Sequence, residues 1–257
     1  MIKLGLKIFS TDTRRIEAVK KCLRQGLFDY VELYAYPDTF DGTIDAWRSI
    51  KTDFIIHAAH FSEGMNLAIG RLAVSNSKLF NEAARFADCL NSVAIILHPG
   101  TSGSVGQTIR QIRSFNDARI VVENKPFINL AGKKCVGASC EEIADIMIAT
   151  GCGFCLDIGH AIKYSYSKSR DMWDTLDNFF GLRPKIIHLT DGTGDTGFDD
   201  HLSFGDGNFP MSRIFKRIKK YRTRAIVTIE TPKSEKRWLK KITDDFTFAQ
   251  DGLAGTL

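Results

Sequence analysis

The stretch IIHLTDGTGDTGFDDHLSFGDG, residues 186–207, joins a short apolar run to a glycine-rich loop. The apolar run ends at His188, and the loop carries Asp199 and His201 two positions apart. Short apolar runs bounded by turn residues are typical of strands buried on both faces of a parallel sheet. Imidazole and carboxylate groups are ligands that suit zinc and manganese. The stretch therefore predicts a buried strand with potential metal ligands at and beyond its end.

An apolar run followed by a helical pattern recurs along the whole chain. Eight strands are predicted, at residues 3–9, 28–37, 53–61, 92–100, 119–127, 153–160, 185–191 and 225–232. Helical patterns follow most of them, and the last helix is predicted at residues 235–246. Eight such units in 257 residues match the size of a closed (β/α)8 TIM barrel, which is an α/β fold. A doubly wound open sheet is the alternative, but its G-x-G-x-x-G motif does not follow the first strand.

The composition is ordinary for a soluble globular protein, with 44% hydrophobic and 25% charged residues. No low-complexity linker interrupts the chain, so we expect one barrel domain spanning residues 1–257. The chain has neither an apolar run of about 18 residues nor a signal-peptide pattern, so we expect a cytoplasmic protein without a membrane span. The net charge of +5 fits an anionic substrate, but solubility alone explains it equally well. Six cysteines are too few for a disulfide scaffold, and we interpret Cys152 and Cys155 as buried thiols.

Imidazole and carboxylate side chains gather at the predicted strand ends, where a TIM barrel places its chemistry. Five of the six histidines and four carboxylates lie at these ends or in the loops just beyond: His57, His98, Glu123, Asp157, His160, His188, Asp199, His201 and Glu230. Crowded carboxylates repel one another and are costly to bury, and divalent cations remove that repulsion. One zinc ion takes about four ligands, so this set suits two or three ions. Clusters of ions are typical of enzymes that cleave phosphoesters.

The candidate ligands lie in a series of short motifs. These are I-I-H-A-A-H from residue 55, L-H-P-G from 97, V-V-E-N from 121, L-D-I-G-H from 156, H-L-T-D from 188, F-D-D-H-L-S-F-G-D-G from 198 and I-E-T-P from 229. In this order, over nearly the whole barrel, they resemble the xylose-isomerase-like TIM barrels and, within them, the endonuclease IV type of apurinic/apyrimidinic endonuclease. The resemblance implies a zinc-dependent hydrolase of DNA repair that acts on DNA with abasic sites. We expect the protein to be a monomer.

The resemblance also implies a trinuclear zinc centre, although such ligands accept manganese and iron too. The implied ligand sets are His57, His98 and Glu123 for the first ion, Glu123, Asp157, His188 and Glu230 for the second, and His160, Asp199 and His201 for the third. Water activated between the first two ions would attack the phosphorus 5′ to the abasic sugar, and the third ion would stabilise the departing 3′-oxygen. Glu123 and Glu230 are the expected catalytic residues, with Glu230 orienting or deprotonating the water.

Two other functions remain open. Sugar and sugar-phosphate isomerases and epimerases of the same superfamily resemble this chain at Glu123, Asp157, His188 and Glu230 only, and they use one ion. Such an enzyme has no need of His98 or of the Asp199/His201 pair, so the full set favours phosphodiester chemistry. The third function is a barrel that binds metal or nucleic acid without catalysis.

Several residues differ from the endonuclease pattern in loops that contact DNA. His60 stands where that family usually has a tyrosine, and Asp200 stands where it commonly has an arginine. The fifth-strand motif continues as E-N-K-P-F in place of a Thr-Ala-Gly-like turn, and the loop before Asp199 is short. A negative charge at residue 200 would not favour a DNA phosphate. The sequence therefore predicts the metal centre more directly than the substrate.

Overall fold

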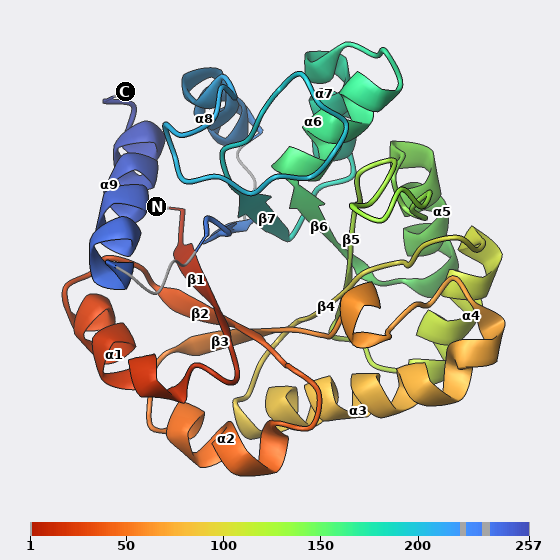
Figure 1. Ribbon diagram of the computed structural model, residues 1–257, viewed down its shortest axis with the longest axis horizontal. Helices are drawn as coiled ribbons and strands as arrows, with labels where there is room; N and C mark the ends of the chain where they lie inside the picture. Colours follow the sequence, from red (N-terminus) through yellow and green to blue (C-terminus); the bar gives the residue numbers. More distant parts are fainter. Residues whose placement is uncertain (1, 222–224, 233–236, 257) are drawn as a thin grey trace.

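Eight parallel strands close into a barrel in the computed structural model, which describes residues 2–221, 225–232 and 237–256. Each strand pairs with the next in sequence, and β8 returns to pair with β1. The strands are β1 (Leu4–Phe9), β2 (Tyr30–Tyr34), β3 (Asp53–His57), β4 (Ile95–Leu97), β5 (Ile120–Glu123), β6 (Gly153–Asp157), β7 (Ile186–Leu189) and β8 (Ile226–Ile229). They lie at the centre of Figure 1, surrounded by the helices. The predicted TIM barrel is confirmed.

The helices that cover the barrel follow the strands in order. They are α1 (Ile16–Arg24), α2 (Phe40–Arg48), α3 (Ala73–Cys89), α4 (Val105–Phe115), α5 (Cys140–Thr150), α6 (Ile158–Ser167), α7 (Met172–Gly181), α8 (Met211–Lys220) and α9 (Trp238–Ala254). Apolar side chains between this ring and the strands form the main core. The last helix was predicted from residue 235, but residues 233–236 lie outside the described part of the chain. No helix that the structure describes is long and apolar enough to cross a membrane.

Alternation along the strands places the polar residues at one end of the barrel. Successive side chains in a strand point to opposite faces, so residues two apart share a face. Residues of several strands, among them Ile55, Val121 and Ile186, form a small apolar cluster apart from the main core. Two positions later on the same faces stand His57, Glu123 and His188. The carboxyl end of the barrel is therefore lined by imidazoles and carboxylates, while apolar side chains fill the barrel beneath them.

Helix α6 is a correction to the sequence prediction, in which the sixth strand spans residues 153–160 and no helix begins before His160. His160 lies in the first turn of this helix, and the Asp157 carboxylate caps the helix by accepting the His160 backbone N–H at 2.7 Å. All residues of α6 from 158 to 165 are buried, so the segment lacks the alternation of apolar and polar faces that reveals a surface helix. Its Gly, Tyr and Ser residues are also weak helix formers. The sequence pattern therefore gave no helical signal.

Candidate metal centre

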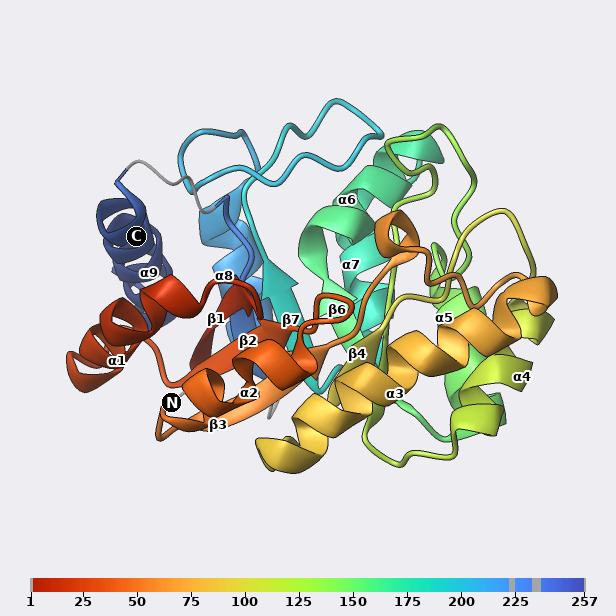
Figure 2. The same ribbon diagram turned by 60° about the horizontal axis from the view of Figure 1, so that its bottom comes forward.

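The structure brings all nine predicted ligands together at the carboxyl end of the barrel. The strands supply His57, Glu123, Asp157 and His188; the positions directly after β4 and β8 supply His98 and Glu230; α6 supplies His160; and the loop between β7 and α8 supplies Asp199 and His201. That loop rises above the strands in Figure 2. The residues span more than 170 positions of sequence, and only closure of the barrel makes them neighbours.

The Glu123 carboxylate lies at the middle of the cluster and is 1% exposed. Its Oε2 lies 3.2 Å from His57 Nε2, 3.1 Å from His98 Nε2 and 3.3 Å from His188 Nδ1. Its Oε1 lies 3.2 Å from His160 Nδ1. One carboxylate contacted by four imidazoles can serve as a ligand to two ions at once.

Asp199 joins the two histidines of the outer part of the cluster. Its Oδ2 lies 3.1 Å from His160 Nε2 and 3.1 Å from His201 Nε2. The Asp157 carboxylate is close on the inner side, with Oδ2 3.5 Å from His160 Nδ1. These four side chains could surround one ion with two nitrogen and two oxygen ligands, which is a common set for zinc.

Hydrogen bonds fix the orientation of four histidine rings. Nδ1 of His57, His160 and His201 lies 2.7, 2.8 and 3.1 Å from the carbonyl oxygens of Ala58, Asn124 and Glu230, so each ring can direct Nε2 into the cluster. His188 is reversed, because its Nε2 lies 2.9 Å from Glu32 Oε2 and its Nδ1 faces Glu230 Oε1 at 2.8 Å. Metal-binding histidines characteristically donate their second N–H to a carbonyl or carboxylate in this way.

The cluster fits divalent ions in two further respects. Asp157 Oδ2 is buried, and no hydrogen bond to it is found among the described residues. Ligand atoms within 4.8 Å of one another form four groups: His57, His98 and Glu123; Glu123, Cys155 and His188; Glu32, His188 and Glu230; and Asp157, His160 and His201. The first matches a predicted ligand set. Asp157 was predicted with His188 and Glu230, yet its carboxylate also reaches the His160 group.

The charges in the cluster shift the protonation of its members. Burial lowers the pKa of His160, but Asp157 and Asp199 outweigh burial and raise it to about 10. Burial also opposes protonation of His201, yet Asp199 and Glu230 raise its pKa to about 9. Burial raises the pKa of Glu230, and the charges of His188 and Lys7 hold it well below its ordinary value. Without metal, protons on the two histidines therefore take the place of positive ions.

Glu32 and Lys7 belong to the centre, although the sequence analysis did not select them. Glu32 is fully buried on β2, where its Oε2 accepts hydrogen bonds from Thr228 Oγ1 at 2.7 Å and from His188. The Lys7 ammonium donates to Glu230 and lies 3.5 Å from Glu32 Oε1. Lys7 interrupts the apolar strand LGLKIF, and Glu32 interrupts the apolar strand YVELY. A charged residue inside such a run was the signal that could have revealed them, because it needs a buried partner.

Asp200 has a different role from the one its charge suggested. Its carboxylate forms an ion pair with Lys163, which is 1% exposed, and accepts the Thr193 backbone N–H at 3.1 Å. Lys163 Nζ also donates to Thr193 O at 2.6 Å. The charge of Asp200 is thus paired beneath the loop, and the interaction holds the segment that carries Asp199 and His201.

His60 lies beside the cluster, facing His98. The two rings stack with centroids 5.4 Å apart and planes 7° apart. Tyr34 is buried against His57 and donates to Glu63, whereas Phe61 and Tyr36 are 39% and 43% exposed. Tyr34 therefore packs in the barrel mouth, whereas the exposed rings of Phe61 and Tyr36 are available to a ligand.

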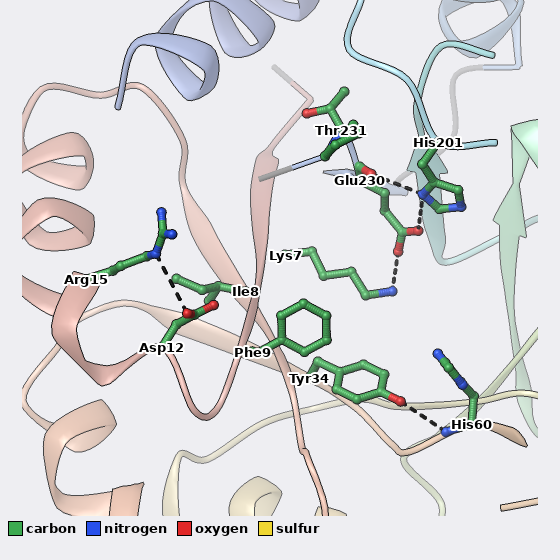
Figure 3. Close-up of a pocket in the computed structure, with 11 residues that line it drawn as sticks. Lys7, Ile8, Phe9, Asp12, Arg15, Tyr34, His60, His201, Glu230 and Thr231 are labelled. Carbon is green, nitrogen blue, oxygen red and sulfur yellow. Dashed lines mark hydrogen bonds and ion pairs between the residues drawn. The ribbon is translucent and has the colours of Figure 1, made fainter. Parts of the chain in front are cut away.

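Two cavities open above the cluster. One has a volume of about 280 Å³ and is lined by residues that include His98, Glu123, Lys125 and Glu230. The neighbouring one, of about 470 Å³, appears in Figure 3, where Lys7 points toward Glu230, and Tyr34 lies beside His60 on the opposite side. Both are lined by His60, His201 and Lys7, so a substrate bound there would touch the cluster.

A sequence profile described as the xylose isomerase-like TIM barrel matches residues 19–249. The chain belongs to the xylose isomerase-like TIM barrel family.

Among curated relatives, the chain is 28% identical over 170 residues to the probable endonuclease 4 of Thermoplasma volcanium, covering 60% of this chain and 58% of that protein. It is 26% identical over 212 residues to endonuclease 4 of Thermus thermophilus, covering 74% of each. Among solved structures, endonuclease IV from Thermus thermophilus has a TM-score of 0.74 at 20% identity, covering 98% and 99% of the two chains. A D-tagatose 3-epimerase-like protein has a TM-score of 0.73 at 17% identity, covering 98% and 97%. The structural similarities thus establish the fold and leave the reaction open.

Proposed function

We propose that the protein is a divalent-metal-dependent phosphodiesterase that hydrolyses the DNA backbone 5′ to abasic sites. The observation that carries the proposal is the convergence of nine potential ligands on one end of the barrel. A sugar isomerase with a single ion has no use for His98, Asp199 and His201. The relatives named endonuclease 4 support the same conclusion.

The centre offers three ligand groups for its ions, which would be zinc or alternatively manganese or iron. Glu123 with His57 and His98 forms the first, and Glu123 with His188 and Glu230, close to Asp157, forms the second. His160, Asp199 and His201 form the third. Ions bound there would supply Lewis acidity toward phosphate oxygens and lower the pKa of a water molecule.

The chain's own residues have distinct tasks in this reaction. Glu230 stays ionised beside His188 and Lys7, so its carboxylate can orient the attacking water by accepting a hydrogen bond. Glu123 holds four imidazoles in one arrangement. The exposed ring of Phe61 lines the smaller cavity and offers an apolar surface to the abasic sugar or a neighbouring base.

The test is a nicking assay on a duplex with one abasic site, using metal-replete protein. We expect cleavage on the 5′ side of the site, leaving a 3′-hydroxyl, and loss of cleavage in Asp199→Asn. Glu17→Gln is the matched control, because Glu17 is an exposed carboxylate on α1 that lines neither cavity. Epimerisation of a sugar substrate without nicking by the same preparation would overturn the proposal.

One observation favours the isomerase alternative. The cavity that contains Glu123 and Glu230 measures about 280 Å³, which is the size of a small ligand. Two carboxylates facing such a cavity could move a proton between carbon atoms of a sugar or sugar phosphate. A substrate screen with aldoses, ketoses and their phosphates, run beside the nicking assay, separates the two enzymes. Metal binding without turnover in either assay would indicate the non-catalytic function.

A further inference from the structure

Lys125 places an ammonium group among the atoms that would bind the ions. Its Nζ lies 3.1 Å from Glu123 Oε1, 3.3 Å from His98 Nε2 and 3.4 Å from His160 Nε2. Two of these contacts, to Glu123 and His98, belong to the first ligand group, and the third belongs to the outer group. The lysine thus lies between two groups, and it contacts ligand atoms of both.

The backbone around Lys125 directs the side chain into the centre. The Lys125 N–H donates to Gly137 O at 3.0 Å, and Pro126 follows directly. On the other side, Asn124 exchanges hydrogen bonds with the Asp157 backbone, with its amide donating to Asp157 O at 3.0 Å and its Oδ1 accepting Asp157 N–H at 2.8 Å. The Lys125 side chain is only 11% exposed. A lysine fixed in this way is part of the centre rather than of the solvent-exposed loop.

Lysine and metal compete for the same atoms. An imidazole nitrogen has one lone pair, so His98 Nε2 cannot accept a hydrogen bond from an ammonium group while it binds an ion. A divalent ion beside an ammonium group is also repelled by it, and this repulsion is strong where water is excluded. Any ion held by His98 and Glu123 must therefore displace Lys125 from its partners.

The charge balance indicates how many ions the centre accepts. Five carboxylates, from Glu32, Glu123, Asp157, Asp199 and Glu230, and two ammonium groups, from Lys7 and Lys125, face the cluster among the described residues. With neutral imidazoles this set carries a net charge of −3. Two divalent ions bring it to +1, which a phosphodiester anion neutralises, whereas three bring it to +3. Buried uncompensated charge is costly, so two ions are favoured over three.

We propose that Lys125 takes the place of the ion in the first ligand group, so that the centre binds two divalent ions tightly. His98 and Glu123 of that group hold the ammonium instead. The inference rests on the metal centre of the proposed function and not on its substrate. In this arrangement Lys125 supplies the positive charge toward a bound phosphate that an ion in the first ligand group would otherwise supply.

The experiment counts ions. Metal-free full-length protein is titrated with zinc against a chromophoric chelator, and bound zinc is measured by mass spectrometry after gel filtration. We expect two tightly bound ions in the wild type and three in Lys125→Met, with at least a tenfold gain in affinity for the third. Lys125→Arg keeps the charge and should bind two. Lys133→Met removes an exposed lysine of the same loop, outside the residues that line the cavity, and should also bind two.

Equal ion counts in the wild type and Lys125→Met, whatever the count, would overturn the proposal, as would three tight ions in the wild type. The d–d absorption of cobalt-loaded protein gives a second readout, since removal of Lys125 should add a third set of bands. Far-ultraviolet circular dichroism shows that each variant is folded before it is counted. The ion count requires no turnover, so it tests the role of Lys125 independently of the substrate. If the count rises from two to three in Lys125→Met but the protein does not nick DNA, only the proposed substrate is refuted.

Discussion

Replacing Glu32 with glutamine should weaken ion binding without touching any proposed ligand. The Glu32 carboxylate accepts the Nε2–H of His188 at 2.9 Å, and this bond turns the opposite nitrogen toward Glu230. In Glu32→Gln the amide oxygen can keep that hydrogen bond, but the charge is lost and the amide group faces Lys7. The ring of His188 becomes a weaker ligand because its partner no longer supports the positive charge that builds on the bound imidazole.

The magnitude follows from the hydrogen bond that changes. A bond to a charged group contributes about 1.5–3 kcal/mol and a neutral one about 0.5–1.5 kcal/mol, so the substitution should cost about 1–2 kcal/mol. That equals roughly a 5–30-fold loss of affinity for the ion bound by His188. Mutations of residues behind metal ligands typically cost about 10–100-fold, which overlaps this range.

The assay is a zinc titration of metal-free protein against a fluorescent chelator, with Glu17→Gln as the control. We expect one ion to bind more weakly in Glu32→Gln and the ion held by Asp199 and His201 to be unaffected. An affinity within twofold of the wild type for every ion would refute the reasoning, because it would show that Glu32 does not support His188.

Three further predictions follow from the same structure. Free zinc at 1,000 times its Kd should stabilise the protein by about 4 kcal/mol, or roughly 8–16 °C in melting temperature by calorimetry, and equal melting temperatures with and without chelator would contradict a preformed centre. Metal-free protein should lose stability from about pH 7 to pH 10 in urea unfolding, because the pKa values of His160 and His201 are raised to about 10 and about 9. In the unfolded chain the histidine pKa is about 6.5, so below that pH the protonated histidines contribute their full stabilisation. The contribution is lost as the pH rises through the raised pKa values of the folded protein. A stability that does not change between pH 7 and pH 10 would contradict these shifts. Gly5→Ala should destabilise the protein by about 1–3 kcal/mol, because the new Cβ would lie 2.2 Å from the buried Tyr30 ring. Gly42→Ala should stabilise the protein by about 0.5–1 kcal/mol, because Gly42 lies in helix α2 with open space around it. Urea unfolding of both variants checks the pair, and equal effects would show that the Tyr30 ring moves aside.

Much of the fold could be predicted because the strands are short apolar runs with turn residues between them. Capping residues mark helix bounds in the sequence, as at α5, where the Ser139 hydroxyl accepts the Glu142 N–H and Gly151 ends the helix with a φ of 73°. The failure at α6 has a clear cause, since a helix buried on every side has no amphipathic pattern. Local sequence therefore predicts a helix only where one of its faces meets water.

The candidate site was predictable to the extent that its residues end strands. His57, Glu123 and His188 could be selected because barrel chemistry lies at strand ends. Glu32 and Lys7 lie within strands, and their proximity to the centre depends on the register that pairs Lys7 with Glu32 and His188 with Thr228. Register is set by pairing between strands far apart in sequence, so it could not be read from either segment alone.

The sequence by itself determined the barrel, its order of strands and the presence of enough imidazole and carboxylate groups for a metal centre. Only the tertiary structure decided which of these groups lie close enough to share an ion, since Glu123 and His98 are 25 positions apart and meet because β4 pairs with β5. It also decided that Lys125 competes for the same atoms, and that Asp200 is paired with Lys163 beneath the loop. The physical reason is that apolar patterning acts locally along the chain, whereas charge balance depends on distances in space.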